Sequence, residues 1–228
     1  GHSMGGHGTW YLGATYPGKW AGIAPCAGYP TLMGYGSADG KIPENSTNKI
    51  EQMLLRASNQ SNVMELARNY KASGVYILHG DADRTVSGEY ARTMRNTLGA
   101  FHNDFSYYEY PNGSHWYGDH SVDWDPLFDF FKWHRSPKVE DLDVIDFTTA
   151  NPAISSNYHW AGIEQQQKPL NYSRIQAKRN VVNKSIVVTT ENVQTFMILP
   201  GAFPKGTAFK LSLDGTEVCS SCVLGDSP

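Results

Sequence analysis

Three short segments carry side chains that could act together in nucleophilic catalysis. Residues 1–5 read GHSMG and fit the pattern G-x-S-x-G, in which small residues let a serine occupy a sharp turn between a strand and a helix. Ser3 is therefore the candidate nucleophile. A serine hydroxyl needs a base to accept its proton and an acid to orient that base.

The acid and the base are expected in turns that follow strands. Residues 79–86, HGDADRTV, follow a short apolar run, and Asp83 is the candidate acid, with Asp81 as the alternative. His115 lies in a glycine-containing turn directly after the strand-like residues 105–110 and is the candidate base. Because the carboxyl ends of parallel strands meet at one edge of a sheet, these groups are predicted to converge.

The chemistry that this set predicts is acyl transfer. His115 would take the Ser3 proton, and the Met4 backbone N–H, at the start of a predicted helix, would stabilise the developing oxyanion. Trp116 and Tyr117, beside the base, are candidate substrate-binding residues. No metal or other cofactor is implied. The remaining histidines are expected to have structural or surface roles: His2, His7, His79, His102, His120, His134 and His159.

A metal-dependent hydrolysis is the weaker alternative. The residues available for it are His79, Asp81, Asp83, Asp119 and His120. They lack the helical HExxH arrangement or the paired cysteine spacing that zinc sites use. We therefore expect the activity to be insensitive to chelators.

The first half of the chain reads as strands alternating with helices, which indicates a parallel sheet. Helices are predicted at 3–16, 47–57, 62–72, 87–98 and 126–134, and strands at 20–27, 75–78 and 105–110. The helix at 62–72 is expected to begin with a capping box formed by Asn62 and Glu65. Residues 28–74 include a long loop and are expected to contribute to substrate specificity.

The pattern changes near Arg135. Beyond it come short strand-like runs separated by turn residues, at 144–148, 158–163, 172–177, 185–190, 195–199 and 209–213. This spacing is typical of a small β-sandwich. We predict two domains, residues 1–136 and a β-rich accessory module at 137–228. Cys219 and Cys222 lack the second pair that a zinc site needs, so a local disulfide or two free thiols is favoured over a redox or metal site.

The segments GHSMGG, HGDADRTV and YPNGSHW resemble the signature segments of prolyl-oligopeptidase-like serine peptidases and their carboxylesterase and dienelactone-hydrolase relatives, in the α/β-hydrolase superfamily. The resemblance covers about residues 1–135 and implies that Ser3, Asp83 and His115 form the catalytic triad. It implies an α/β fold, with the C-terminal part of an α/β-hydrolase sheet flanked by helices, followed by the β-rich, sandwich-like module. The implied activity is cleavage of a peptide or ester bond through an acyl-enzyme.

The resemblance also implies a longer enzyme. The strands that precede the serine turn in that family, and the loop that supplies its second oxyanion donor, are absent from these 228 residues. We therefore expect the chain to be the C-terminal part of a longer protein, and residues 1–228 alone to be inactive.

Composition excludes several other classes. Nineteen Lys and Arg against 22 Asp and Glu give a net charge of −3, which provides no basic surface for nucleic acid. No apolar run approaches the roughly 20 residues of a membrane span. The low charge content and the resemblance favour a secreted or periplasmic location. The alternative from another class is a non-catalytic protein whose β module binds a glycan or a partner.

Overall fold

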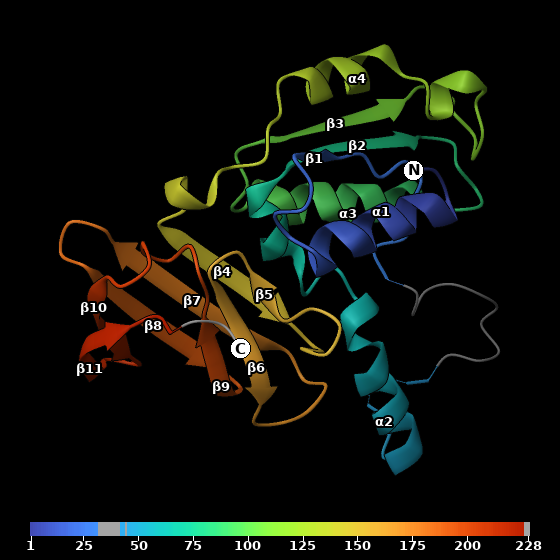
Figure 1. Cartoon of the computed structure of the whole chain (residues 1–228). Helices are drawn as coiled ribbons and strands as arrows, with labels where there is room; N and C mark the ends of the chain where they lie inside the picture. The colour runs from blue at the N-terminus through green and yellow to red at the C-terminus, as the bar shows by residue number, and fades with distance from the viewer. Residues whose placement is uncertain (32–41, 44, 226–228) are drawn as a thin grey trace. The chain divides into compact units, whose positions relative to one another are not determined.

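The computed structural model describes residues 1–31, 42–43 and 45–225 (Figure 1). The chain divides into two compact units, Gly1–Ser136 and Pro137–Pro228. Residues 32–41 and 44, which belong to the stretch expected to contribute to substrate specificity, lie outside the described residues.

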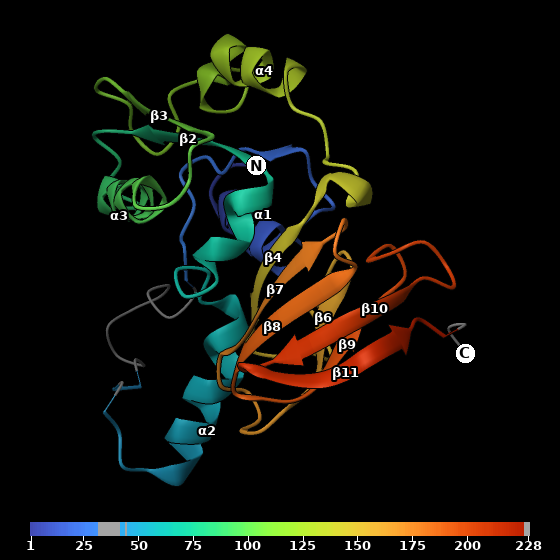
Figure 2. The same cartoon turned by 90° about the vertical axis from the view of Figure 1, so that its left-hand side faces the viewer.

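The first unit is built on a small parallel sheet. Its strands, in spatial order, are β1 (Gly22–Ile23), β2 (Gly74–Gly80) and β3 (Phe105–Tyr110). Every residue of β2 is buried, as expected for the central strand of a sheet covered on both faces. The helices α1 (Met4–Thr15) and α3 (Gly88–Gly99) lie on one side of the sheet, and α4 (Asp125–Lys132) lies on the other (Figures 1 and 2).

Local sequence explains where the helices begin. The Ser87 side chain accepts a hydrogen bond from the Glu89 N–H and caps α3, and apolar Ala91, Met94 and Leu98 form its buried face. A proline in the first turn of α4 suits a position that has no intrahelical acceptor for an N–H. The helix α2 (Lys49–Ser58) is capped by the Asn48 side chain.

The α-helix predicted at residues 62–72 is wrong. Turns occupy 63–66, and a 3₁₀-helix follows at Ala67–Ala72. Tertiary hydrogen bonds hold this backbone: the Val63 N–H donates to the Pro30 carbonyl, and the Tyr70 hydroxyl donates to the Trp10 carbonyl. Asn62 does not form the predicted capping box, because its Oδ1 is buried and accepts no hydrogen bond within the described ranges.

The second unit contains two sheets. The larger has the strand order β11-β10-β8-β7-β4 and the smaller has the order β5-β6-β9. The strands are β4 (Val144–Thr149), β5 (Asn157–Tyr158), β6 (Ala161–Gln166), β7 (Ser173–Asn180), β8 (Ser185–Glu191), β9 (Val193–Ile198), β10 (Ala208–Leu213) and β11 (Thr216–Val223). Along β7 alternate side chains are buried, which is the signature of a strand with one face on a core.

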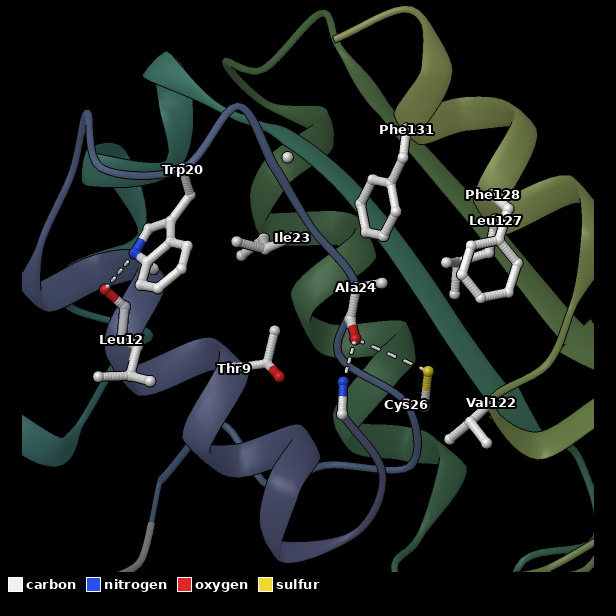
Figure 3. Close-up of a pocket in the computed structure, with 13 residues that line it drawn as sticks. Thr9, Leu12, Trp20, Ile23, Ala24, Cys26, Val122, Leu127, Phe128 and Phe131 are labelled. Carbon is white, nitrogen blue, oxygen red and sulfur yellow. Dashed lines mark hydrogen bonds between the residues drawn. The ribbon is translucent and has the colours of Figure 1, made fainter. Parts of the chain in front are cut away.

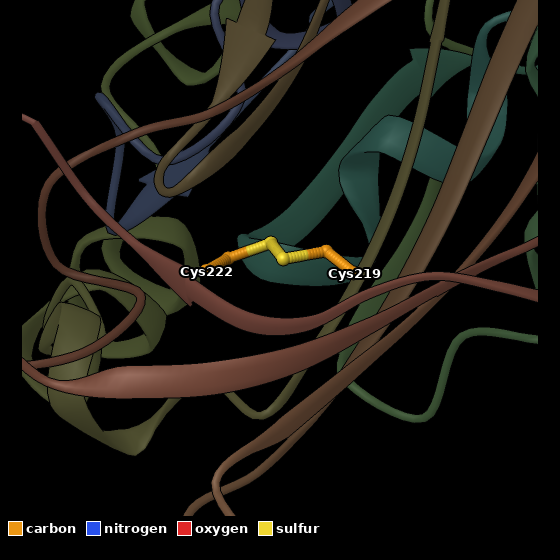
Figure 4. The surroundings of a disulfide bond; sticks show 2 residues. All are labelled: Cys219 and Cys222. Atoms are coloured by element: carbon orange, nitrogen blue, oxygen red, sulfur yellow. A yellow bond between two sulfur atoms is a disulfide. The ribbon is translucent and has the colours of Figure 1, made fainter.

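The strand β11 was not predicted and contains the Cys219–Cys222 disulfide (Figure 4). Phe209 of β10 pairs with Cys222 and Leu211 pairs with Cys219, so the register shifts between them. The disulfide therefore spans a bulge in an edge strand, and bulges are a common way to prevent such an edge from pairing with another chain. Cys26 is the free, buried cysteine of the first unit.

The predicted fold class needs correction. Of the eleven strands in the described residues, eight belong to the second unit, and strand exceeds helix, 31% against 27%. The structure is mostly β, with three small sheets and few helices, and it is not an α/β-hydrolase sheet with flanking helices. The sequence predicted three strands for the first unit, but β1 has only two residues, and the eight strands of the second unit outweigh this small parallel sheet.

The helices in the described ranges are too short or too polar to cross a lipid bilayer.

Candidate active site

The candidate nucleophile lies on a strained turn at the start of α1. Ser3 has φ 57° and ψ −120°, a conformation that costs a non-glycine residue about 1–3 kcal/mol. Hydrogen bonds on both sides of Cys26 hold it there: the Ser3 N–H donates to the Cys26 carbonyl at 2.9 Å, and the Cys26 N–H donates to the Gly1 carbonyl at 2.8 Å. The backbone of the serine turn is thus tied to the segment that continues β1.

Close packing behind the turn requires a glycine at position 6. A Cβ on Gly6 would lie 2.3 Å from the Cys26 carbonyl oxygen and 2.8 Å from the Gly28 Cα. Gly5, the last glycine of the sequence pattern, would bring a Cβ within 4 Å of nothing. A Cβ on Gly1, the first glycine of the pattern, would lie 2.6 Å from the Gly5 carbonyl oxygen, so the turn requires small residues at positions 1 and 6 but not at position 5.

The acid and base turns follow adjacent strands and touch each other. Gly80, at the end of β2, pairs with Tyr110, at the end of β3. A Cβ on Gly80 would lie 2.3 Å from the Gly113 carbonyl oxygen, so the two turns approach at backbone distance. The chain reverses after β3 through Pro111 and Asn112, and Asn112 takes the positive φ of 55° that this turn needs.

The structure brings Ser3, His115 and Asp83 together. His115 Nε2 lies 2.9 Å from Ser3 Oγ, and His115 Nδ1 lies 2.8 Å from Asp83 Oδ2. A carboxylate can only accept a hydrogen bond, so Nδ1 carries the proton and Nε2 is left to accept from the serine hydroxyl. This arrangement is competent for removal of the hydroxyl proton during nucleophilic attack.

The surroundings of Asp83 keep it ionised. Its side chain is fully buried, and Oδ1 accepts hydrogen bonds from the Thr85 and Val86 N–H groups at 2.8 and 2.9 Å. Burial alone would raise the pKa of this carboxyl group, but the hydrogen bonds from His115, Val86 and Thr85 outweigh it and lower the pKa. A charged carboxylate is what an orienting acid must supply to a histidine.

The alternative acid, Asp81, is exposed, and the carboxylate bonded to His115 is that of Asp83. Met4 is the first residue of α1, a position where the N–H has no intrahelical acceptor. Trp116 is 54% exposed and packs edge-on against the His2 ring. Tyr117 stacks on Tyr110 and packs against the core of the unit, so a substrate-binding role for it stays a prediction.

Two histidines that the sequence left as structural lie against this set. His2 Nε2 is 2.7 Å from the His115 carbonyl oxygen, and His79 Nε2 is 3.4 Å from Asp83 Oδ2. His79 is buried and donates a hydrogen bond to the Val86 carbonyl at 2.9 Å. Burial lowers the pKa of both histidines, so each is neutral at neutral pH. A signal that could have drawn attention to them is their position, one residue before Ser3 and four before Asp83.

The described residues contain no group of three or more His, Cys, Asp or Glu side chains arranged to hold a metal ion. In the alternative metal set, Asp83 contacts both His79 and the base His115, whereas His120 contacts the Tyr110 hydroxyl at 3.1 Å.

An apolar pocket of about 310 Å³ lies between α1, β1 and α4 (Figure 3). Trp20 and Ile23 form one side of it, and Phe128 and Phe131 of α4 form the other. Gly1 and Cys26 also line it, but Ser3, Asp83 and His115 do not. We therefore do not assign the reacting part of a substrate to this pocket.

No family model matches the chain. The chain is similar to an uncharacterized secreted protein of Arthroderma benhamiae, with 27% identity over 221 residues. The match covers 95% of this chain but 23% of that protein, so the chain spans about a quarter of the length of this relative. The name of the relative states a location and no activity, so the activity has to be argued from the site.

Proposed function

We propose that this chain carries the catalytic residues of a serine hydrolase that cleaves an acyl bond, in a peptide or an ester. The observation that carries the proposal is the continuous hydrogen-bonded path from Ser3 Oγ through both nitrogens of His115 to a buried, ionised Asp83. A histidine with a purely structural role would not require a serine in a strained conformation at one ring nitrogen and a buried carboxylate at the other.

In the proposed mechanism, Ser3 Oγ attacks the carbonyl carbon of the substrate while its proton passes to His115 Nε2. The new imidazolium is stabilised by Asp83, which also fixes the tautomer of the ring. His115 then gives its proton to the leaving amine or alcohol, and an acyl-Ser3 intermediate remains. Water then attacks the carbonyl carbon of this ester while His115 takes its proton. The bond to Ser3 Oγ breaks, His115 returns the proton to Ser3 Oγ, and the acyl group leaves as a carboxylic acid.

The Met4 N–H is the proposed oxyanion donor. It stands at the positive end of α1, where backbone N–H groups and the helix dipole favour negative charge. Loss of one such donor typically costs about 10²–10³ in rate. The resemblance of the sequence segments supports a prolyl-oligopeptidase-type peptidase first and a carboxylesterase second, and the chemistry of the three side chains serves both.

We further propose that the protein is exported. The similar Arthroderma protein is named as secreted, and the Cys219–Cys222 disulfide is of a kind that persists in oxidising compartments.

The test is covalent labelling of the full-length protein by a fluorophosphonate. The Ser3 oxygen would displace fluoride from phosphorus, and mass spectrometry would find the adduct on the peptide that contains Ser3. Ser3→Ala should abolish labelling, because it removes the hydroxyl that is hydrogen-bonded to His115 Nε2. Ser220→Ala, at an exposed serine in the second unit, is the matched control and should be labelled like the wild type.

Stoichiometric labelling of the Ser3→Ala protein would overturn the assignment. An unlabelled wild type would also contradict it and would favour the non-catalytic binding role. Comparison of an ester and an amide of the same acyl group then separates an esterase from a peptidase.

A further inference from the structure

His2 connects the serine turn to the backbone of the base. Its Nε2 lies 2.7 Å from the carbonyl oxygen of His115, 113 positions away along the chain. A carbonyl oxygen only accepts, so His2 Nε2 carries the proton and donates it to this bond. A neutral imidazole can donate this hydrogen bond, so His2 does not have to be protonated to form it.

The backbone of His2 is part of the same fixed segment as Ser3. His2 and Cys26 form a parallel bridge, and the hydrogen bonds from the Ser3 and Cys26 N–H groups lie on either side of it. A side chain that leaves this segment therefore starts from a fixed point. A group that is hydrogen-bonded to the His2 side chain is therefore kept at a fixed distance from Ser3 Oγ.

The ring of His2 also supports the base turn. Its centroid is 4.9 Å from that of the His115 ring, and it meets the Trp116 ring edge-on at 5.0 Å. The His115 side chain is 24% exposed and lies in a turn, and turns are generally more mobile than the strands that they follow. The contacts of His2 with this turn therefore limit its movement relative to Ser3.

His2 is not a competing base. Burial lowers its pKa, a donated hydrogen bond to the His115 carbonyl raises it, and a positive charge on His115 lowers it again. The other titratable groups that act on it are Asp83, whose negative charge raises the pKa, and His79, which lowers the pKa when it is protonated. His2 therefore stays neutral while His115 gains and loses its proton.

We propose that His2 is a positioning residue for the base: its donated hydrogen bond holds the His115 turn so that the imidazole stays within hydrogen-bond distance of Ser3. This inference rests on the proposed hydrolase function. A misplacement of reacting groups by about 1 Å can cost about 100-fold in rate, so one backbone hydrogen bond at this point can have a large kinetic effect.

Two substitutions separate the hydrogen bond from the ring. His2→Phe keeps an aromatic ring against His115 and Trp116 but has no donor. His2→Gln loses the ring but keeps an N–H at similar reach. His120→Phe makes the same chemical change at an exposed histidine outside the site and serves as the control.

The measurements are the inactivation rate constant and the inhibitor constant for a fluorophosphonate, on the full-length protein, and the low-field proton signal of the His115–Asp83 hydrogen bond in one-dimensional NMR. For His2→Phe we expect the rate constant to fall by about 10-fold to 100-fold with little change in the inhibitor constant, and the proton signal to broaden or disappear. His2→Gln should recover most of the rate and keep the signal, and His120→Phe should match the wild type.

A folded His2→Phe protein that reacts at the wild-type rate would overturn the proposal, and so would a His2→Gln protein as slow as a folded His2→Phe. If His2→Phe fails to fold, His2→Gln decides: a rate and signal near those of the wild type support the proposal, and loss of both contradicts it. If the wild type itself is unlabelled, the hydrolase function has failed, and the proton signal in the variants still tests the positioning alone.

Discussion

At Asp83 a buried carboxylate keeps its charge because the backbone supplies the donors that water would otherwise provide. The Thr85 and Val86 N–H groups occupy Oδ1, which leaves Oδ2 for His115. His79 Nε2, 3.4 Å from Oδ2, adds a partial positive charge on the same side. The two oxygens of the carboxylate therefore have different roles: Oδ1 stabilises the turn, and Oδ2 accepts the hydrogen bond from His115.

Asp83→Asn should keep the turn and lose the activity. The amide oxygen can still accept from Thr85 and Val86, but an amide N–H in place of Oδ2 cannot accept from His115 Nδ1. The imidazole would then present the wrong tautomer to Ser3, and fluorophosphonate labelling should slow by about 10³–10⁴-fold. Asp81→Asn is the matched control at an exposed aspartate in the same turn and should react normally. The reverse ranking of the two variants would transfer the role of the acid to Asp81.

The sequence could predict that Ser3, Asp83 and His115 meet, because each follows a strand or precedes a helix in a turn of recognisable composition. His2 and His79 are close to Ser3 and Asp83 along the chain, but this closeness alone does not predict which atoms they contact, because histidine also occurs as a core residue. Their contacts depend on where the carbonyl of His115 and the turn of Asp83 come to lie in space. For Tyr117 closeness in sequence was misleading in the other direction: it is two residues from the base, but its ring packs against the core of the unit.

At the level of elements, the junction of α1 with the segment after β1 determines the direction of the serine. Gly6 and Gly28 approach each other so closely that neither has room for a side chain. Gly8, on the same helix, would place a Cβ in open space. Two glycines two positions apart therefore have opposite consequences for stability.

Gly6→Ala should destabilise the protein by about 1–3 kcal/mol, because the Cβ would force apart two backbone segments. It should also slow labelling of Ser3, since the displaced helix carries the serine turn with it. Gly8→Ala should instead stabilise the protein by about 0.5–1 kcal/mol, through the better helix propensity of alanine. Denaturant unfolding of both variants measures the difference. Equal stabilities would contradict the close packing at Gly6.

The elements that the sequence predicted well are those whose pattern and packing agree. The strand at 105–110 is an example, and so is α3, which starts beside the predicted Ser87. Residues 62–72 failed because tertiary hydrogen bonds, such as that from Val63 to Pro30, replaced the helical ones. The strand β11 was missed because its mostly exposed side chains show no apolar alternation.

At the scale of the whole molecule, the fold class depends on the balance between the two units. The predicted class followed the first half, although the second half already carried six of the nine predicted strands. Alternating strands and helices correctly indicated parallel pairing of β1, β2 and β3. The second unit contributes most of the strands, and these make the structure mostly β.

Two buried histidines, His79 and His102, make the stability of the first unit depend on pH. His79 and His102 are 1% and 5% exposed, and burial lowers the pKa of each. His102 Nε2 donates to the carbonyls of Tyr70 and Ser73, and its Nδ1 accepts from the Asp104 N–H. Protonation of Nδ1 would turn that acceptor into a donor that faces another donor, in a site with little water.

The sign of the effect follows from the direction of these shifts. Below the ordinary histidine pKa of about 6.5, these histidines bind protons in the unfolded chain but remain neutral in the folded unit. The free energy of unfolding must therefore decrease as the pH falls. Each such histidine contributes at most about 1.4 kcal/mol per pH unit. Asp83, whose pKa is lowered, stabilises the fold above the pKa of an unfolded carboxyl group, about 4, and its contribution is lost only in more acidic solution.

The free energy of unfolding should therefore decrease from pH 7.5 to pH 5.5. The His102→Gln side chain keeps an N–H for the two carbonyls but cannot gain a proton. The free energy of unfolding of this variant should therefore depend less steeply on pH, by up to about 1.4 kcal/mol per pH unit. Urea melts of the full-length protein at the two pH values, with and without this substitution, measure the slopes. His134→Gln, at the histidine that contacts Asp104 near the surface, controls for a general effect of losing an imidazole. If His102→Gln and the wild type had the same slope, the cost of protonation would have to come from other groups, and burial of His102 would not be what makes acid destabilising.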